Sequence, residues 1–528
     1  MRDTSYPGRS NILSTSGIAA TSNPLSTLEA ISILKKGGNA IDASIAASAV
    51  QSVVEPGSTG IGGDCFALIS INGKKPLSVN GSGIASKNSN IDFFKKKGIK
   101  KISPTSPHSV TIPGAVHAWY TMHQKFGKLD FEQLFITAEN YALNGYPVYE
   151  IAARDWNENL LKLSKNQNSK KIFLNKNKPY QFAQIHKNIP LAKTLNSIGK
   201  KGIEDFYRGY IAQDIVNSLN ELGGNHSIDD FAMQSTILED SISNTYKDKI
   251  IHQCPPNGPG ITVLIMMAML EKFNFKNIHA MSAKRFHLQA EITKIAYEIK
   301  ERYLGDKKFI DFNSKNFLNK KYINFLSNKI NLNKCYHPNH SLITAHPETV
   351  YLTVVDRDLN SVSFINSLCF GFGSGITTKK TGILLQNRGV NFRLDESHPN
   401  KIDSHKRPLH TIIPGIVNNK KNQTILTYGV MGGQYQPIGH AHFLQNLFEF
   451  NMSVQESIDF PRAFHLNGQY LIEKLIPKKI KKELKIIGHN IKYSEKPHGG
   501  SQAIFIDRKK GVLIGGSDSR KDGCAIGI

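Results

Sequence analysis

Cysteine is scarce in this chain, and the way it is distributed argues against a cysteine-based fold. Five cysteines occur among 528 residues, an odd number, and none belongs to a C-x-x-C pair. They are Cys65, Cys254, Cys335, Cys369 and Cys524. Disulfide scaffolds need many paired cysteines, and common zinc sites need closely spaced ones. We therefore expect neither a disulfide framework nor a metal.

Long apolar runs are also missing. The longest, from Ile261 to Leu270, has about half the length that a helix needs to span a bilayer. The opening residues, MRDTSYPGRS, contain no apolar stretch of signal-peptide length. We expect no membrane partner and a cytoplasmic location.

Acidic residues are fewer than basic ones, 42 against 66, which gives a net charge of +24. The lysine-rich stretches KKKGIKK (95–101) and KLIPKKIKKELK (474–485) have neither interleaved aromatics nor a nucleic-acid-binding motif. Such stretches are typical of a solvated surface. Nucleic acid is therefore not an expected partner.

The order of helical and strand patterns predicts a layered α+β protein. We expect helices over 24–36 and 40–54, a glycine turn and strand within 57–73, helical periodicity over 113–150 and through most of 190–300, and one helical segment near 437–458. Strand patterns occur at 348–368, 382–389, 424–433, 502–507 and 511–518. Two sheets that face each other between helices would accommodate this order.

A Lys-, Asn- and His-rich stretch at about 305–348 has little periodicity, and we expect a mobile connector there. It contains His337 and His340. Neither histidine has an acidic or thiolate partner at a fixed spacing, so both are expected to be exposed loop residues and not metal ligands.

Candidate catalytic groups have to be sought outside the common hydrolase motifs, because G-x-S-x-G and H-E-x-x-H are both missing. Thr349 opens a strong strand directly after the connector. If the Glu348–Thr349 bond were cut, the new α-amine, with a pKa of about 7.7–8.0, would lie beside the hydroxyl of the same residue and could act as its base. The local pattern alone also fits an ordinary β-branched strand residue.

A pair of glycines supplies the second element that acyl transfer needs. Gly432 and Gly433 follow the strand TYGVM, where unobstructed backbone N–H groups can stabilise an oxyanion. Taken alone, a Gly-Gly pair after a strand is also typical of a simple turn.

Ten motifs, in one order along nearly the whole chain, resemble the γ-glutamyltransferase (glutathione hydrolase) family and its glutathione hydrolase-like bacterial proenzymes. They are TSNPLSTLEAISILKKGGNAIDASIAA, EPGSTGIGGDCF, TIPGAVHAW, PPNGPGIT, ETVYLTVVDRDLNSVSFINS, GFGSGITTKKTGILLQNRG, KRPLHTIIP, GVMGGQYQPIGH, FPRAF and GGSDSRKDG. Any single motif is weak, and the ordered set is specific.

The resemblance implies a four-layer αββα sandwich of the N-terminal-nucleophile hydrolase type, made as one self-cleaving chain. The matching cut lies between Glu348 and Thr349. It would give a large chain, 1–348, and a small chain, 349–528, intertwined in one unit. Thr349 would then attack a substrate amide and form an acyl-enzyme, which water or an amine resolves. The resemblance implies no cofactor and no metal, and the processed units could associate as a dimer.

Further site residues follow from their places in the matching motifs. Ser367 falls where the family keeps a hydroxyl that supports the nucleophile. His410 and Thr411 fall where it keeps a serine pair beside the substrate carboxylate. Gly432 and Gly433 match the oxyanion glycines. Arg388 stands at a substrate-side position that is usually polar and uncharged, where it could serve as the cation for a substrate carboxylate.

Two departures from the family pattern leave the substrate open. Ser82 stands where an arginine usually holds the substrate α-carboxylate, and Asn391 stands where an aspartate usually holds the α-amine. A charge-assisted hydrogen bond contributes roughly 1.5–3 kcal/mol, so the loss of both anchors matters unless they are replaced. Cys369 also replaces a polar residue, and we expect it to be a structural, buried one.

Three functional hypotheses therefore stand. The first is a self-processing enzyme that acts on γ-glutamyl compounds such as glutathione. The second keeps the mechanism but takes another acyl group, such as the glutaryl-type substrates of the related cephalosporin acylases. The third is an uncut, non-enzymatic homologue.

Overall fold

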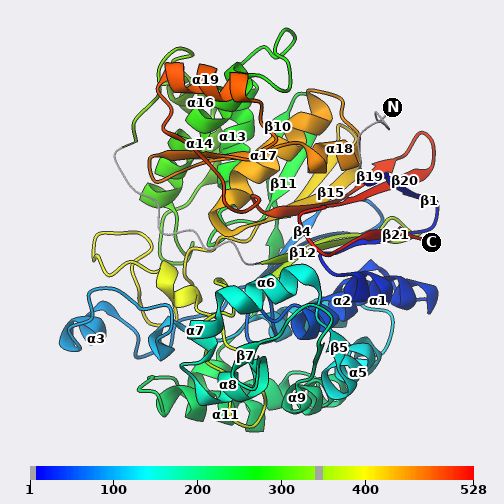
Figure 1. The fold of residues 1–528 in the computed structure, drawn as a ribbon, viewed down its shortest axis with the longest axis vertical. Coiled ribbons are helices and arrows are strands. Elements are labelled where there is room, and N and C mark those ends of the chain that lie inside the picture. Colours follow the sequence, from blue (N-terminus) through cyan, green and yellow to red (C-terminus); the bar gives the residue numbers. More distant parts are fainter. Residues whose placement is uncertain (1–7, 339–348) are drawn as a thin grey trace.

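The computed structural model describes residues 8–338 and 349–528. In the described chain, two seven-stranded sheets are stacked face to face, with one group of helices outside each sheet (Figure 1). This arrangement confirms the four-layer αββα sandwich. All strand pairs within the two large sheets are antiparallel.

Sheets A and B are named here by their strands. In spatial order, sheet A consists of β1 (Ile12–Ser14), β20 (Val512–Ser517), β19 (Gly500–Asp507), β15 (Thr424–Met431), β14 (Pro414–Asn419), β11 (Lys249–Gln253) and β10 (Ile242–Tyr246). Sheet B consists of β21 (Ala525–Gly527), β2 (Ile18–Ala20), β12 (Val350–Val355), β13 (Ser361–Ser367), β3 (Asp64–Ser70), β4 (Leu77–Gly81) and β9 (Ile237–Asp240). There are also three small sheets in the described chain. The first consists of β16 (Ala463–Leu466), β17 (Gln469–Ile472) and β18 (Ile491–Tyr493). The second pairs β5 (Tyr146–Pro147) with β8 (Ile185–His186), and the third pairs β6 (Leu174–Asn175) with β7 (Lys178–Pro179).

The helices divide between the two halves of the sandwich. With sheet B lie α1 (Pro24–Lys35), α2 (Ala40–Val54), α3 (Ile91–Lys96), α4 (Ala115–Phe126), α5 (Ile136–Asn144), α6 (Glu150–Glu158), α7 (Leu160–Leu163), α8 (Gln167–Phe173), α9 (Ile189–Lys201), α10 (Glu204–Tyr207), α11 (Tyr210–Asn220) and α12 (Ile228–Ala232). With sheet A lie α13 (Gly260–Leu270), α14 (Ala283–Tyr303), α15 (Ser314–Leu318), α16 (Lys320–Ser327), α17 (Gln436–Phe448), α18 (Val454–Asp459) and α19 (Lys478–Ile487). The 3₁₀ turns are η1 (Pro107–Ser109), η2 (Phe131–Leu134), η3 (Arg388–Asn391) and η4 (Gly433–Tyr435).

The central helix α2 shows how the sequence builds the layer below sheet B. Asn39 caps its first turn and forms a capping box with Asp42. Every residue of α2 is buried, and most are small. Small side chains let the helix lie against α1 and α5 on one side and against β12 and β13 on the other. The expected helix over 40–54 is therefore confirmed, and it supports the strand that follows Thr349.

The two sheets pack on each other through a separate apolar layer. It contains Phe66, Leu68, Cys254, Tyr351, Ile365, Ile412, Ile416 and Met431. The Tyr351 ring of β12 lies over Gly429 of β15, where an added Cβ would come within 2.2 Å of it. Two residues along, the Thr353 and Thr427 hydroxyls are 2.8 Å apart. Residue numbers increase along β12 from Tyr351 to Thr353, while those of their partners on β15 decrease from Gly429 to Thr427. The Thr349 end of β12 therefore lies at the Met431 end of β15.

One secondary-structure prediction was wrong, and a second, helix through most of 190–300, holds but missed three strands. Residues 382–389 form only isolated bridges at Leu384 and Leu385 before η3 begins, because this segment crosses the loop at Gly62 instead of joining a sheet. Within 190–300, residues 237–253 form β9, β10 and β11, since pairing with β4 and β14 overrides the local helical pattern.

Other segments differ in detail from the expectation. The helical segment near 437–458 is two helices, α17 and α18. The expected connector contains the short helices α15 and α16, and its residues 339–348 lie outside the described chain. Among the described residues, no helix combines the length and the apolar character that crossing a bilayer requires.

The contact between Tyr351 and Gly429 gives a stability prediction. Gly429→Ala would push a methyl group into the buried ring and separate the sheets, so we expect the free energy of unfolding to fall by about 1–3 kcal/mol in urea titrations. Gly199→Ala is the matched control, because its Cβ would meet neighbours only at 3.4 Å or more. Equal stability of the two variants would contradict the role given to this contact.

Candidate active site

Thr349 lies at the entrance to the central strand β12 and is 1% exposed. Val350 pairs with Asn366 across the ladder to β13, which places Thr349 beside Ser367. The Thr349 Oγ1 and Ser367 Oγ atoms are 3.2 Å apart. The predicted nucleophile and its predicted supporting hydroxyl are therefore in hydrogen-bonding contact.

A row of polar side chains continues from this pair. Arg388 donates from Nη2 to Ser367 Oγ at 3.1 Å and from Nη1 to Thr411 Oγ1 at 2.8 Å. The arginine is completely buried, and its Nε has no hydrogen-bond partner among the described residues. In that part of the chain, no carboxylate forms a salt bridge with it. The structure thus brings four of the predicted site residues, Thr349, Ser367, Arg388 and Thr411, into one hydrogen-bonded row.

The turn after β13 shapes this row. Cys369 has a φ of 81°, and its backbone N–H donates to Ser367 Oγ at 2.9 Å. The thiol is buried, and desolvation raises its pKa. A protonated thiol in this position agrees with the structural role expected for Cys369.

His410 turns away from the row, although it is next to Thr411 in the sequence. Its Nε2 lies 2.9 Å from Asp64 Oδ2. Burial, and secondarily the positive charge of Arg388, lower the pKa of His410 to about 4. The ring is therefore neutral at physiological pH, and it positions the buried carboxylate instead of reaching Thr349.

Asp64 is a site residue that the sequence analysis did not identify. It pairs with Ser367 in the β3–β13 ladder. Its Oδ1 accepts hydrogen bonds from Gly83 N at 2.9 Å, Gly114 N at 3.3 Å and Gln386 Nε2 at 2.9 Å. The sequence feature that could have identified Asp64 is an acidic residue directly after the glycine turn GIGG, at the start of a strand. Aspartate is rarely fully buried unless it is paired, so its presence there indicates a specific role.

The two predicted oxyanion glycines form a turn that only glycine adopts without strain. Gly432, between β15 and η4, has a φ of 123°, and Gly433, the first residue of η4, has a φ of 54°. An added Cβ at Gly432 would lie 2.8 Å from the Gly499 Cα. The next residue, Gln434, is bound by two side chains of α14, Tyr297 and Lys300. The antiparallel crossing of β12 and β15 puts this turn at the Thr349 end of the sheets.

Ser82 and Asn391, which replace the usual charged substrate anchors, make neutral hydrogen bonds. Ser82 Oγ accepts from Asn257 Nδ2 at 2.9 Å, and Asn391 Nδ2 donates to the Leu409 carbonyl at 3.1 Å. A buried arginine, Arg407, lies beside Ser82, but its guanidinium donates to the carbonyls of Ser82 and Ser235. Arg388 is therefore the cation that stands closest in the hydrogen-bond network to the threonine.

Comparison with known families agrees with this geometry. The family described as gamma-glutamyltranspeptidase matches residues 27–528. The chain belongs to this family. The family includes amidohydrolases and acyltransferases with the N-terminal-nucleophile fold, and the present chain is an enzyme of that class.

Curated relatives match along nearly their whole length. The chain is 34% identical over 507 residues to the glutathione hydrolase-like YwrD proenzyme of Bacillus subtilis, covering 94% of this chain and 95% of the relative. It is 28% identical over 526 residues to the glutathione hydrolase proenzyme of Escherichia coli, covering 96% and 90%. Both relatives are named proenzymes.

A solved structure is also similar throughout. The cephalosporin acylase from Bacillus halodurans superposes with a TM-score of 0.94 at 33% identity, covering 100% of this chain and 99% of the other. The Helicobacter pylori gamma-glutamyltranspeptidase gives a TM-score of 0.56 at 28% identity, covering 60% and 91%. The family fold is thus shared with proteins that are named for different substrates.

The Asp64 contacts give a prediction for this gamma-glutamyltranspeptidase-family protein. Asp64→Ala would remove the best acceptor of three buried donors, Gly83 N, Gln386 Nε2 and His410 Nε2, so we expect the free energy of unfolding to fall by about 3 kcal/mol or more. Asp64→Asn should lose less, because an amide oxygen can keep the first two donors while the His410 proton moves to Nδ1. Urea unfolding measures both.

An exposed aspartate on α3 provides the control for the Asp64 variants. Asp92→Ala should change stability by less than about 0.5 kcal/mol, since Asp92 is exposed. If Asp64→Ala were as stable as Asp92→Ala, the proposed organising role of the Asp64 carboxylate would be wrong.

Proposed function

We propose that this protein is a self-processing enzyme that hydrolyses or transfers the γ-glutamyl group of glutathione-like amides through an acyl-enzyme on Thr349. One observation carries the proposal: the Thr349 hydroxyl, at the head of β12, contacts Ser367, which in turn accepts from a buried arginine. Donation from Arg388 to Ser367 leaves the serine hydroxyl able to orient its own proton toward the threonine oxygen.

Maturation would use the same hydroxyl. Thr349 Oγ1 attacks the carbonyl carbon of Glu348, a residue outside the described chain. The peptide C–N bond breaks, an ester forms, and the nitrogen takes a proton to become the α-amine of Thr349. Water then hydrolyses the ester, which yields the Glu348 carboxylate and a free Thr349 hydroxyl.

Catalysis would then repeat the chemistry on a substrate amide. The α-amine of Thr349 accepts the hydroxyl proton while Oγ1 attacks the substrate carbonyl. The backbone N–H groups at Gly432 and Gly433 are suited to stabilise the oxyanion, since the turn is rigidly held by Gly499 and by α14. The leaving amine departs with the proton, and water or an acceptor amine releases the acyl group from the threonine.

Arg388 supports an acyl donor that carries a carboxylate. A buried guanidinium whose Nε has no partner among the described residues is costly unless a charged group satisfies it. A substrate carboxylate supplies both a negative charge and hydrogen-bond acceptors. Arg388 would thus take over the role that Ser82 cannot fill.

A second candidate is a glutaryl-type amide, which has the carboxylate of a γ-glutamyl group but no α-amine. The neutral Asn391 favours it, because the position lacks the carboxylate that would pair with an ammonium group. The similarity to the Bacillus halodurans cephalosporin acylase points in the same direction. The named glutathione hydrolase relatives favour the γ-glutamyl donor.

Processing can be tested directly. Wild-type protein should give two bands on denaturing electrophoresis, and mass spectrometry should find a chain that begins at Thr349. Thr349→Ala should remain one band, because it has no hydroxyl to attack the bond. Thr353→Ala is a control for loss of a threonine hydroxyl on the same strand, and it should still be cut. An active wild-type protein with an intact 348–349 bond would contradict the mechanism.

The donor can be tested with three p-nitroanilides. The proposal expects turnover of γ-glutamyl-p-nitroanilide, and turnover of glutaryl-p-nitroanilide alone would establish the second candidate. Butanoyl-p-nitroanilide has no carboxylate and serves as the internal control. Arg388→Gln should lower kcat/KM for the carboxylate-bearing donors by about 10- to 100-fold, the value of one charge-assisted bond. An equal loss for all three donors would refute a carboxylate-binding role for Arg388.

A further inference from the structure

A second cluster of reactive side chains lies outside the Thr349 row, in the half of the molecule with sheet A. It consists of His287 and Glu291 on α14, Cys335 after α16, and His489 after α19, and all four are buried. One ligand atom from each lies within 4.8 Å of every other. Cysteine, histidine and carboxylate are the donors of four-coordinate zinc sites.

The geometry of the two histidines resembles that of a zinc ligand pair. His287 Nε2 lies 2.8 Å from the Asn331 carbonyl, so it carries the proton and donates to that oxygen. Its Nδ1 therefore presents a lone pair, and it faces His489 Nε2 at 2.8 Å. A backbone carbonyl that accepts from the far ring nitrogen is the usual outer support of a metal-bound histidine.

His489 completes the histidine pair from the segment after α19. Because its Nε2 faces the lone pair of His287 Nδ1, the His489 proton lies between the two rings when no ion is bound. A metal ion at this place needs a lone pair from each ring, so the His489 proton would move to Nδ1 when the ion binds. Each ring would then offer one nitrogen to the ion.

Glu291 contributes negative charge to the cluster. Its Oε2 accepts from the Tyr336 backbone N–H at 2.6 Å, and its Oε1 accepts from Lys294 Nζ at 2.6 Å. A carboxylate has about four lone-pair sites, so two contacts leave room for a metal. Lys294 also lines an adjacent cavity of about 520 Å³.

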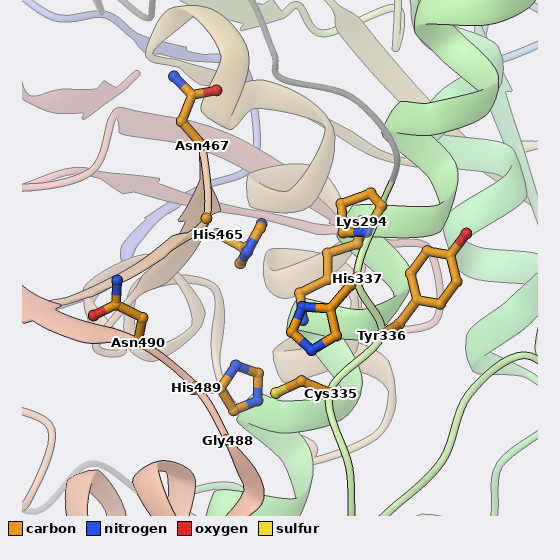
Figure 2. Close-up of a pocket in the computed structure, with 11 residues that line it drawn as sticks. Lys294, Cys335, Tyr336, His337, His465, Asn467, Gly488, His489 and Asn490 are labelled. Atoms are coloured by element: carbon orange, nitrogen blue, oxygen red, sulfur yellow. The ribbon is translucent and has the colours of Figure 1, made fainter.

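Figure 2 shows the sulfur of Cys335 beside the ring of His489, with Lys294 next to them at the cavity. A bound divalent ion would displace the thiol proton, and the thiolate and carboxylate together would balance its charge. His337, exposed as expected, also lines the cavity, and His340 lies outside the described residues.

We propose that His287, Glu291, Cys335 and His489 form a structural zinc site. Tetrahedral zinc, with bonds of about 2.0–2.3 Å, separates its ligand atoms by roughly 3.3–3.8 Å. The two histidine nitrogens, now 2.8 Å apart, would therefore separate slightly, and the more widely spaced ligand atoms, which lie within 4.8 Å, would move closer. Thiolate and imidazole select zinc over magnesium or calcium. The ion would tie α14 and the segment before Thr349 to the segment after α19.

The site would have a consequence for the mature protein, and this part rests on the proposed cleavage. Three ligands belong to residues 1–348 and one, His489, to residues 349–528. Cys335 stands fourteen residues before Thr349 in the sequence. The zinc ion would therefore link the two chains after cleavage. It would also brace α14, which binds the turn beside the oxyanion glycines through Tyr297 and Lys300.

Cobalt binding tests the site in untagged, full-length Thr349→Ala protein, so that a failure of processing cannot affect the result. Protein stripped with chelator under reducing conditions should bind one equivalent of Co²⁺ and develop a near-ultraviolet thiolate-to-cobalt absorption band, which Zn²⁺ then abolishes. Cys335→Ser should lose the band, and its zinc affinity should fall by at least 100-fold. Cys524→Ser removes a cysteine outside the cluster and should behave like the parent.

Thermal unfolding gives a second measurement. Zinc should raise the melting temperature of the parent and of Cys524→Ser, and much less that of Cys335→Ser or His489→Gln. The proposal is overturned if the parent shows no saturable one-to-one binding, or if both ligand variants bind zinc as tightly as the parent does.

Discussion

Arg388 brings a full positive charge into the interior of the sandwich, where an ion without adequate partners costs several kcal/mol. The chain meets part of this cost with the hydroxyls of Ser367 and Thr411, and the same bonds draw β13, η3 and the segment before β14 around the head of β12. Thr349 is the end of that network. The Arg388 guanidinium that would bind a substrate carboxylate therefore also holds Ser367 and Thr411 in place around Thr349.

The network can be this precise because the two sheets hold its parts rigidly. Tyr351 packs over Gly429, and the Thr353 and Thr427 hydroxyls meet across the interface. These contacts bring the beginning of one strand and the end of another to one place, so that a threonine and a glycine turn 83 residues apart lie at the same end of the two sheets. The helix α14 supports that turn from the other side and carries two of the proposed zinc ligands further along its length. Catalytic geometry and metal binding would then share one structural element.

Local patterns predicted the elements whose own side chains determine them. The helix over the small residues of 40–54 and the strand pattern at 348–368 needed no distant information, and both are confirmed. The strands at 237–253 were missed because their pairing with β4 and β14 decides their conformation. The segment 382–389 has an apolar pattern that is typical of a strand. It is buried because it crosses the loop at Gly62, and not because it joins a sheet. Motif order gave the predicted roles of Thr349, Ser367, Arg388 and the Gly432–Gly433 turn, which stay predictions, whereas Asp64 and the cluster around Cys335 were not identified from the sequence.

The sequence by itself determined the family, the layered α+β fold and the threonine on which the proposed chemistry depends, because these follow from residues in a specific order along one chain. Only the tertiary structure decided that His410 faces Asp64 while Thr411 faces Arg388, and that Cys335 meets two histidines from distant segments. The reason is physical: hydrogen bonds and metal ligation depend on distances of a few ångströms, and folding sets those distances between residues that no local spacing connects.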